Sequence, residues 1–351
     1  MLRAASGAYR AATALRNAAY HRGWVRPVRL PCPVVSVGSL TVGGAGKTTC
    51  VELIARKLAL RGRRVAILSR GYGGVQHPYV LRAEAGRLRV EGTAAADLDG
   101  LADEPQLLAG RLEGVPIIVG ARREETGRLA CATFGADTLL LDDGFQHRRL
   151  ARDCELVLIP ARMPLAGWAL LPRGPMREPL TALGRADVIV ITKAAEALDM
   201  LGALQERLRS FNPRAVVVTA IHQPARLTEG RTGTALSLRR LEGAQVGLVS
   251  SIGDPQGFEA TAQQLHAVVR WHCAFPDHYR YDHAAFEAIS AKVAAERPAA
   301  VLTTEKDWIR LRALATARPE FPVPVWVVGV QMELLSGEAL LDDRLARVCA
   351  R

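Results

Sequence analysis

Short apolar runs rich in β-branched residues alternate along this chain with longer segments whose apolar residues recur at helical spacing. Seven such runs precede residue 222, at 34–37, 65–68, 117–119, 138–141, 156–159, 188–191 and 216–218. A strand buried on both faces is a continuous apolar run, and strands that alternate with helices form parallel sheets covered by helices. The pattern therefore predicts an α/β fold with a parallel sheet.

A second set of apolar runs follows a polar stretch and occupies 246–249, 268–271, 301–303 and 325–328. A chain of 351 residues is long for one hydrophobic core, because single cores stop growing near about 250–300 residues. We therefore expect a basic N-terminal helix within 1–29, a larger parallel-sheet domain over 30–222 and a smaller α/β/α domain over 223–351. We place a linker near 222–236, and the C-terminal helix can return to the first domain.

The segment 3–22 has helical spacing with a weak apolar face. One side of this helix carries Ala5, Ala8, Ala12, Leu15 and Ala19, and the opposite side carries Arg3, Arg10, Asn17 and His21. A basic helix of this kind can lie on an anionic membrane surface, where each arginine contributes on the order of 1 kcal/mol. A helix that packs on the main domain with a solvated basic face explains the pattern equally well.

Positive charge is concentrated at the N-terminus. The formal net charge is +11, and 1–51 contains seven basic residues and no acidic one. Aromatic residues are only 5% of the chain, which disfavours a stacking platform for single strands, so we expect no nucleic-acid partner. The cysteines form no CxxC pair, and we find neither a signal peptide nor a long apolar run, which predicts a cytoplasmic protein that is at most peripheral to a membrane.

The run at 34–37 leads into a glycine-rich loop and then into a helical stretch at 51–60. Strand, glycine loop and helix in this order are the context of a phosphate-binding loop, in which Lys47 reaches the β- and γ-phosphates and Thr48 binds Mg²⁺. The fold expected for 30–222 is therefore that of a P-loop NTPase-like domain. The predicted ATP-binding residues are Thr41, Val42, Gly43, Gly44, Ala45, Gly46, Lys47 and Thr48.

Phosphate loops serve kinases, GTPases and ATP-driven switches alike. A GTPase would need an Asn/Thr-Lys-x-Asp clamp for guanine, whereas Thr192 and Lys193 are followed by two alanines, so ATP is the better hypothesis. A P-loop GTPase or ATPase switch, a metallochaperone and a nucleotide-binding scaffold without catalysis remain alternatives. The metallochaperone would also need a Cys/His cluster, which the sequence does not display.

The apolar run at 138–141 is followed directly by Asp142 and Asp143. A strand tip beside a phosphate loop is where an acid holds the metal ion, so we assign Thr48 and Asp142 to Mg²⁺. A polar turn after a strand is the alternative, since Asp-Gly is a common turn pair.

Together these segments resemble the tetraacyldisaccharide 4′-kinase family over nearly the whole chain. The loop matches as TVGGAGKT at 41–48, and the acid pair matches as DDGFQH at 142–147. Further matching segments are SRGYG at 69–73, DEP at 103–105, LPRGPMREP at 171–179, IGDP at 252–255, FPDH at 275–278 and TTEKD at 303–307.

The resemblance implies transfer of the γ-phosphate of ATP, with Mg²⁺, to the 4′-hydroxyl of a tetraacylated glucosamine disaccharide 1-phosphate, which forms lipid IVA. It implies a glycolipid substrate at the cytoplasmic face of the bacterial inner membrane, and we expect a monomer. In that family the Asp of the DEP segment and the His of the PDH segment together activate the hydroxyl; here these are Asp103 and His278. Taken alone, Asp103 suits a helix cap and His278 a structural role.

The same resemblance places Lys47 in the catalytic set and implies a group of residues that face the substrate. These are Arg70, Arg123, Asp143, Gln146, Arg177 and Glu178. The arginines suit the substrate's 1-phosphate or the transferring phosphate, because a guanidinium offers a rigid fork of donors. Surface salt bridges are the alternative for each of them.

Overall fold

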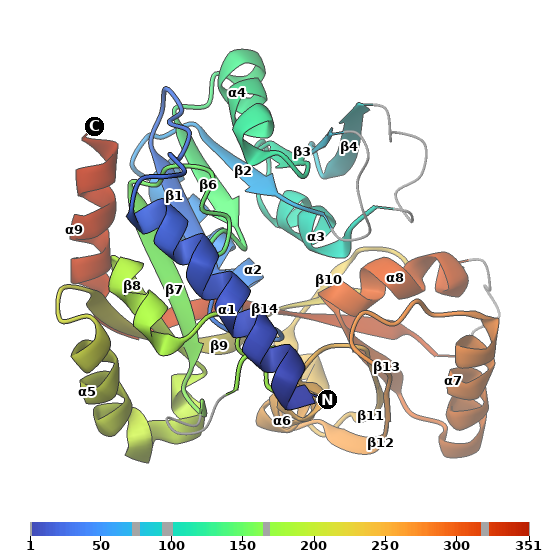
Figure 1. The fold of residues 1–351 in the computed structure, drawn as a ribbon. Coiled ribbons are helices and arrows are strands. Elements are labelled where there is room, and N and C mark those ends of the chain that lie inside the picture. The colour runs from blue at the N-terminus through green and yellow to red at the C-terminus, as the bar shows by residue number, and fades with distance from the viewer. Residues whose placement is uncertain (1, 72–77, 93–100, 164–168, 317–322, 351) are drawn as a thin grey trace. The chain divides into compact units, whose positions relative to one another are not determined.

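The computed structural model describes residues 2–71, 78–92, 101–163, 169–316 and 323–350, and the chain forms two compact units (Figure 1). Tyr72 and Gly73 of the SRGYG segment lie outside the described residues. Unit 1 comprises Met1–Ala96, Leu108–His222 and Met332–Arg351, and unit 2 comprises Asp97–Leu107 and Gln223–Gln331. The chain therefore passes between the units more than once.

Unit 1 is built on a mainly parallel sheet with the strand order β9-β8-β7-β1-β6-β2-β5-β3-β4. Its strands are β1 (Val34–Ser39), β2 (Val65–Ser69), β3 (Tyr79–Glu84), β4 (Arg87–Gly92), β5 (Ile117–Val119), β6 (Thr138–Asp142), β7 (Cys154–Pro160), β8 (Val188–Thr192) and the first part of β9 (Val216–Glu229). Its helices are α1 (Leu2–His21), α2 (Lys47–Ala59), α4 (Arg123–Phe134), η2 (Leu180–Arg185), η3 (Ala194–Met200), α5 (Leu201–Phe211), α9 (Glu338–Cys349) and the end of α3 (Asp103–Arg111). Strands β3 and β4 form an antiparallel hairpin at one edge.

Helices cover both faces of this sheet. Helix α2 leads from β1 to β2, and α4 leads from β5 back to β6 in the opposite direction along the strand order. Because such crossovers are right-handed, the two helices lie on opposite faces. On the face covered by α4, Leu139 of β6 packs with Ala130 of α4, and Ile189 of β8 packs with Leu204 of α5.

Unit 2 has the strand order β12-β11-β13-β14-β9, with β11 to β14 paired in parallel. Its elements are β10 (Ala235–Leu236), η4 (Leu238–Leu241), β11 (Gln245–Ser250), α6 (Pro255–Gln264), β12 (Val268–Ala274), α7 (His283–Glu296), β13 (Ala300–Thr304), α8 (Glu305–Thr316) and the first part of β14 (Val325–Ser336). Val301 of β13 packs with Phe286 of α7, whereas its neighbour Leu302 packs with Phe258 of α6. Helices therefore cover both faces of this sheet as well.

Each of the predicted apolar runs is a strand, and the stretch where the linker was expected contains β-structure. Strand β9 continues through Glu229, and β10 pairs with it in antiparallel orientation. Most side chains of the second half of β9 are only partly buried, so this strand carries polar residues and lacks the apolar signal. The chain leaves unit 1 after His222, inside β9, and returns after Gln331, inside β14.

Helix α1 packs on unit 1 through the side that carries Ser6 and Tyr9, whereas Arg3, Arg10 and His21 are exposed. The Ser6 hydroxyl donates to the Leu170 carbonyl at 2.9 Å, and the Tyr9 hydroxyl donates to the Arg177 carbonyl at 3.1 Å. The alanine side, with Ala5, Ala8, Ala12 and Leu15, is exposed. None of the helices in the described part of the chain has the length and apolar character needed to cross a membrane.

Candidate active site

The phosphate loop lies between β1 and α2, as the sequence predicts. Strand β1 ends at Ser39, and α2 begins at Lys47. Gly43 and Gly46 have φ angles of 86° and 82°, a left-handed conformation that favours glycine. A Cβ atom added to Gly43 or Gly44 would meet nothing within 4 Å, so this part of the loop borders open space. The unpaired amides of the first turn of α2 add a partial positive charge that suits phosphate.

The segment at 175–177 holds the loop backbone. Val42 N donates to the Pro175 carbonyl at 2.9 Å, and Arg177 N donates to the Leu40 carbonyl at 2.7 Å. Two motifs that are far apart in the sequence therefore pair directly. This pairing fixes the shape of the loop before any phosphate binds.

The two carboxylates after the apolar run of β6 have different surroundings. Strands β1 and β6 pair in parallel with Val37 opposite Asp142, which places the acids beside the start of the loop. Asp142 is buried and accepts from the Ser69 hydroxyl at 3.1 Å. Asp143 adopts a left-handed φ of 51°, and its Oδ1 atom lies 3.8 Å from Lys47 Nζ. The loop lysine is thus paired with the second acid.

Arg177 and Gln146 join the same cluster. Nη1 of Arg177 donates to the two carboxylate oxygens of Asp143 at 2.8 and 2.7 Å and to Gln146 Oε1 at 3.3 Å. The Gln146 amide nitrogen donates to the Ser39 carbonyl at 3.0 Å, at the end of β1. Asp143 is therefore shared by two cations, Lys47 and Arg177, that also suit phosphate oxygens.

The residues beside the loop fit Mg²⁺ bound together with ATP. Among the described residues, no group of three or more His, Cys, Asp and Glu side chains is placed to hold a metal ion. Mg²⁺ needs no such group, because it keeps several waters and binds one or two carboxylates together with substrate phosphates. Thr48 in the first turn of α2 and Asp142 at the end of β6 provide a hydroxyl and a carboxylate of this kind.

Arg70 and Arg123 lie near the acid pair. Arg70 directly follows β2, and Arg123 is the first residue of α4. Burial is the largest cause that lowers the pKa of Arg123; the charge of Arg70 lowers it further, whereas Asp142 and Asp143 oppose the shift. Burial, and then the charge of Arg123, lower the pKa of His147 to about 4, so this imidazole is neutral at pH 7.

The structure does not bring Glu178 to this cluster. Its side chain is fully buried and accepts from Asn17 Nδ2 at 2.8 Å and from two nitrogens of Arg185, each at 3.1 Å. Arg16 lies 3.5 Å away. The carboxylate therefore holds α1 and η2, instead of facing a substrate as expected from the sequence.

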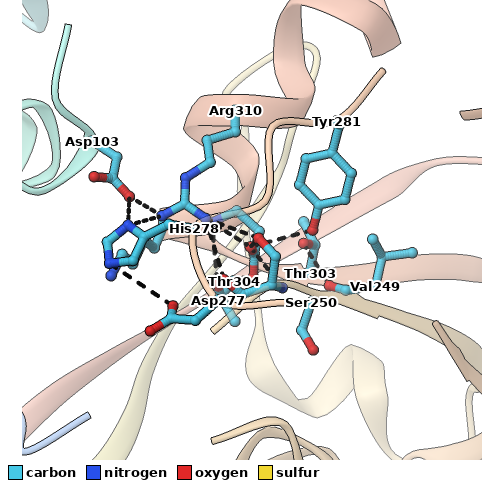
Figure 2. A network of polar contacts seen from close by, with 12 residues as sticks. Asp103, Val249, Ser250, Asp277, His278, Tyr281, Thr303, Thr304 and Arg310 are labelled. Carbon is cyan, nitrogen blue, oxygen red and sulfur yellow. Dashed lines mark hydrogen bonds and ion pairs between the residues drawn. The ribbon is translucent and has the colours of Figure 1, made fainter. Parts of the chain in front are cut away.

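In unit 2, Asp103, His278 and Arg310 form a second polar cluster (Figure 2). Nη2 of Arg310 donates to Asp103 Oδ2 and lies 3.1 Å from His278 Nδ1. The direct distance from His278 Nδ1 to Asp103 Oδ2 is 3.8 Å, which is too long for a hydrogen bond. Arg310 therefore connects the two residues that the resemblance implies are catalytic.

A guanidinium group has donors only, so the contact with Arg310 requires His278 Nδ1 to accept. The ring proton then resides on Nε2, which lies 3.9 Å from Asp277 Oδ1. The side chain of His278 is 39% exposed, whereas that of Asp103 is 9% exposed. The imidazole is thus open to a substrate while the carboxylate beside it is almost buried.

A network around Ser251 positions both His278 and Arg310. His278 adopts a left-handed φ of 60°, and its N–H donates to the Ser251 carbonyl at 3.1 Å. Nη1 of Arg310 donates to the Ser251 hydroxyl oxygen at 2.9 Å. Asp307, fully buried, accepts from Ser251 N at 2.9 Å and from the Thr304 hydroxyl at 2.7 Å. The start of α8 therefore anchors the cluster.

Asp103 is held in its ionised form. Burial alone raises the pKa of this carboxyl, but the charges of Lys306 and Arg310 outweigh burial and bring the pKa below its ordinary value. Lys306 is itself held by Glu104 at 3.2 Å. A carboxylate that stays charged beside a neutral imidazole can accept a proton from a hydroxyl.

Sequence reasoning did not find Arg310 or Ser251. Arg310 lies just beyond the TTEKD segment, and its spacing of three residues from Asp307 places both on one side of α8. That spacing is the one local signal for Arg310. Its contact with Asp103 joins α8 to the start of α3, which lies far away in the sequence.

The glycine loop with its acid pair defines a P-loop nucleotide-binding protein, and the cluster around Asp103 adds groups that can activate an acceptor, as a kinase requires. The profile of the tetraacyldisaccharide-1-P 4′-kinase family matches residues 1–350. This chain belongs to that family.

Proteins of similar sequence or structure match this chain over nearly its full length. A tetraacyldisaccharide 4′-kinase of Anaeromyxobacter sp. (strain K) is 46% identical over 349 residues, which cover 97% of this chain and 89% of that protein. The tetraacyldisaccharide 4′-kinase of Syntrophus aciditrophicus (strain SB) is 38% identical over 334 residues, which cover 93% and 87%. Among solved structures, LpxK from Aquifex aeolicus in complex with ATP is similar with a TM-score of 0.72 and 28% identity, covering 98% of this chain and 96% of that chain. The switch and metallochaperone alternatives are not favoured.

Proposed function

We propose that this member of the tetraacyldisaccharide 4′-kinase family transfers the γ-phosphate of ATP to the 4′-hydroxyl of a tetraacylated disaccharide 1-phosphate, which forms lipid IVA in lipid A synthesis. The observation that carries the proposal is the phosphate loop whose Lys47 shares Asp143 with Arg177, in a chain that matches the family from end to end. Enzymes catalyse phosphoryl transfer mainly by positioning and by neutralising charge. The loop provides both.

The phosphates of the nucleotide and the metal ion bound with them have proposed partners in unit 1. The amides of the loop and Lys47 hold the phosphates, and Thr48 with Asp142 holds Mg²⁺, which neutralises phosphate charge. Asp143 orients Lys47 and Arg177 toward the same side of the cluster.

The acceptor is activated by groups of unit 2. Arg310 occupies the Oδ2 atom of Asp103, so we assign the other oxygen, Oδ1, to the proton of the 4′-hydroxyl. His278 bears its proton on Nε2 and assists by holding the hydroxyl or a phosphate oxygen. A positioned base of this type contributes about 10²–10⁴-fold to the rate.

The two arginines near the acid pair are candidates for anion binding. Arg123 is 3% exposed, and its one hydrogen bond within the described part of the chain is a long one of 3.5 Å to the Ala121 carbonyl. A buried guanidinium with so little hydrogen bonding suits a phosphate oxygen, because unpaired buried donors are costly. We assign Arg123, with the exposed Arg70, to the 1-phosphate of the lipid or to the phosphate in transfer.

Helix α1 is the proposed contact with the membrane. Ser6 and Tyr9 contact unit 1, and the side that remains exposed carries alanines and Leu15, which is 67% exposed. Trp24 follows the helix and is 65% exposed. The arginines of the N-terminal segment add attraction to anionic lipid. We place the protein at the cytoplasmic face of the inner membrane as a peripheral monomer.

A transfer assay tests the proposed function. Purified protein is incubated with ATP labelled at the γ-phosphate, Mg²⁺ and the disaccharide 1-phosphate in detergent, and the lipid is extracted. We expect label in the lipid at the 4′-position, and no label in a parallel reaction with Lys47→Met. Wild-type protein that binds ATP but leaves the lipid unlabelled would exclude the proposed reaction.

A further inference from the structure

We propose that His222 is a positioning residue for the phosphate loop. His222 holds the turn at Gly46, and with it Lys47, in the shape that receives the phosphates of ATP. His222 is in β9, the last residue of unit 1 before the chain enters unit 2. It belongs to none of the segments that resemble the family motifs. The inference rests on the proposed binding of ATP by the loop and adds a residue to that site.

A chain of two hydrogen bonds links His222 to the loop. Thr49, in the first turn of α2, donates its hydroxyl hydrogen to the Gly46 carbonyl at 2.9 Å, and its oxygen lies 3.0 Å from His222 Nε2. A hydroxyl has one hydrogen, so the second contact requires His222 Nε2 to be the donor. The imidazole therefore fixes Thr49, and Thr49 fixes the carbonyl of the turn.

The ring is also in close contact with Gly46 itself. A Cβ atom added to Gly46 would lie 2.5 Å from His222 Nε2 and 2.6 Å from Cε1, so the ring touches the glycine where any other residue has a side chain. Gly46 has a φ of 82°, and the next residue is Lys47. A shift of the imidazole ring would move the Gly46 turn, and with it Lys47 and the first backbone amides of α2.

Neighbouring contacts fix a second loop carbonyl in the same way. The Thr192 hydroxyl, at the end of β8, donates to the Ala45 carbonyl at 3.1 Å. The Ala45 carbonyl is thus bound by Thr192 of β8. The Gly46 carbonyl is bound by Thr49, which in turn contacts His222 of β9. When the carbonyls are engaged on that side, the adjacent amides are available on the other, which is the arrangement that anions bind.

Electrostatics keep His222 in the form that this role requires. Burial is the largest cause that lowers the pKa of His222 to about 4, and the nearby charges of Lys193 and Arg111 add to the effect. The ring is therefore neutral at pH 7. A neutral ring donates one hydrogen bond to Thr49 without placing a further positive charge beside Lys47.

The test compares ATP affinity, measured by calorimetry with Mg²⁺, in variants that keep or remove the donor. Leucine at this position, His222→Leu, removes the donor and is expected to weaken ATP binding at least tenfold. His222→Gln keeps an N–H donor and is expected to stay within about threefold of wild type. Thr49→Val removes the same contact from the other side, and the double variant should bind no more weakly than the worse single variant.

A matched control separates this role from general packing. His272 is another largely buried histidine, and its Nε2 lies 2.8 Å from the Ser250 hydroxyl in unit 2. His272→Leu is expected to lower thermal stability as His222→Leu does, but to leave ATP affinity unchanged. If folded His222→Leu and Thr49→Val bind ATP like wild type, His222 is only a packing residue and the inference is overturned.

A measurement on wild-type protein covers the case in which these variants fail to fold. Nitrogen NMR of the imidazoles should show His222 neutral with its proton on Nε2 between pH 6 and 8, the condition set by the Thr49 contact. Its signals should move when ATP is added. A proton on Nδ1, or signals indifferent to ATP, would exclude the role. Wild-type protein that does not bind ATP would instead contradict the proposed function.

Discussion

The Nδ1 atom of His278 and the Oδ2 atom of Asp103 are 3.8 Å apart, and one nitrogen of Arg310 contacts both. The two residues implied to activate the acceptor are therefore coupled through a cation instead of a direct hydrogen bond. In this arrangement Asp103 carries a negative charge, and His278 Nδ1 carries no proton. Asp103 is therefore the base, and His278 is the residue that assists it.

Replacing the assisting residue should affect turnover and leave nucleotide binding intact. His278→Ala removes the imidazole beside Asp103, and we expect kcat to fall by about 10²-fold with little change in ATP affinity. His283→Ala is the matched control, because His283 is an exposed histidine of the same unit. Steady-state kinetics and calorimetry check both values. An unchanged rate for His278→Ala would remove this residue from the mechanism.

The pH dependence of the rate should report on Arg310. Asp103 has a lowered pKa, so its charged form persists at neutral pH and is lost as the pH falls through that value. Arg310→Leu removes one of the charges that lower the pKa, so the acid limb of kcat should move to higher pH. Arg312→Leu is the control, because Arg312 contacts Gln106 from the same helix. If the acid limb of kcat does not move in Arg310→Leu, Arg310 does not lower the pKa of Asp103.

Parts of this molecule were predictable because their signal is local. The strands β6 and β8 are buried at every position, which produces the continuous apolar runs from which the sheet was predicted. The phosphate loop is contiguous, so its glycines, Lys47 and Thr48 could be assigned without coordinates. Strand β4, by contrast, alternates exposed and half-buried positions and carries arginines, so the hairpin was missed.

Other parts depend on contacts between distant segments. Arg310 reaches Asp103 and His222 reaches Thr49 only after α8 and β9 are in place, and no spacing in the sequence encodes these pairs. Glu178 shows the opposite failure. Its place beside Arg177 in a family motif suggested the substrate, but the buried side chain binds Arg185 and Asn17.

Glu178 should therefore matter for stability more than for binding. Glu178→Ala leaves the guanidinium of Arg185 without its carboxylate, and breaking a buried pair in this way costs about 3–5 kcal/mol. We expect that loss in the free energy of unfolding measured with urea, and an unchanged ATP affinity in the folded variant. Unaltered stability together with a raised KM for the lipid would restore the substrate role.

The exposed side of α1 should determine membrane binding. Leu15→Asp places a charge on that side, and the loss of one buried leucine, about 1.5–3 kcal/mol, predicts at least tenfold weaker binding to vesicles that contain phosphatidylglycerol. Leu198→Asp is the control, because Leu198 is a comparably exposed leucine on η3. Cosedimentation measures both. Equal binding of Leu15→Asp and wild type would contradict a membrane contact through α1.

The central claim is that the phosphate loop binds ATP while Asp103 activates the acceptor hydroxyl. One variant measured in two ways tests this claim most directly. Asp103→Asn keeps the shape of the side chain and removes its charge, so calorimetry should give the ATP affinity of wild type. Phosphate transfer to the lipid should fall by about 10²–10⁴-fold, as expected for the loss of a general base. Transfer at the wild-type rate would contradict the account, because the hydroxyl would then be activated elsewhere.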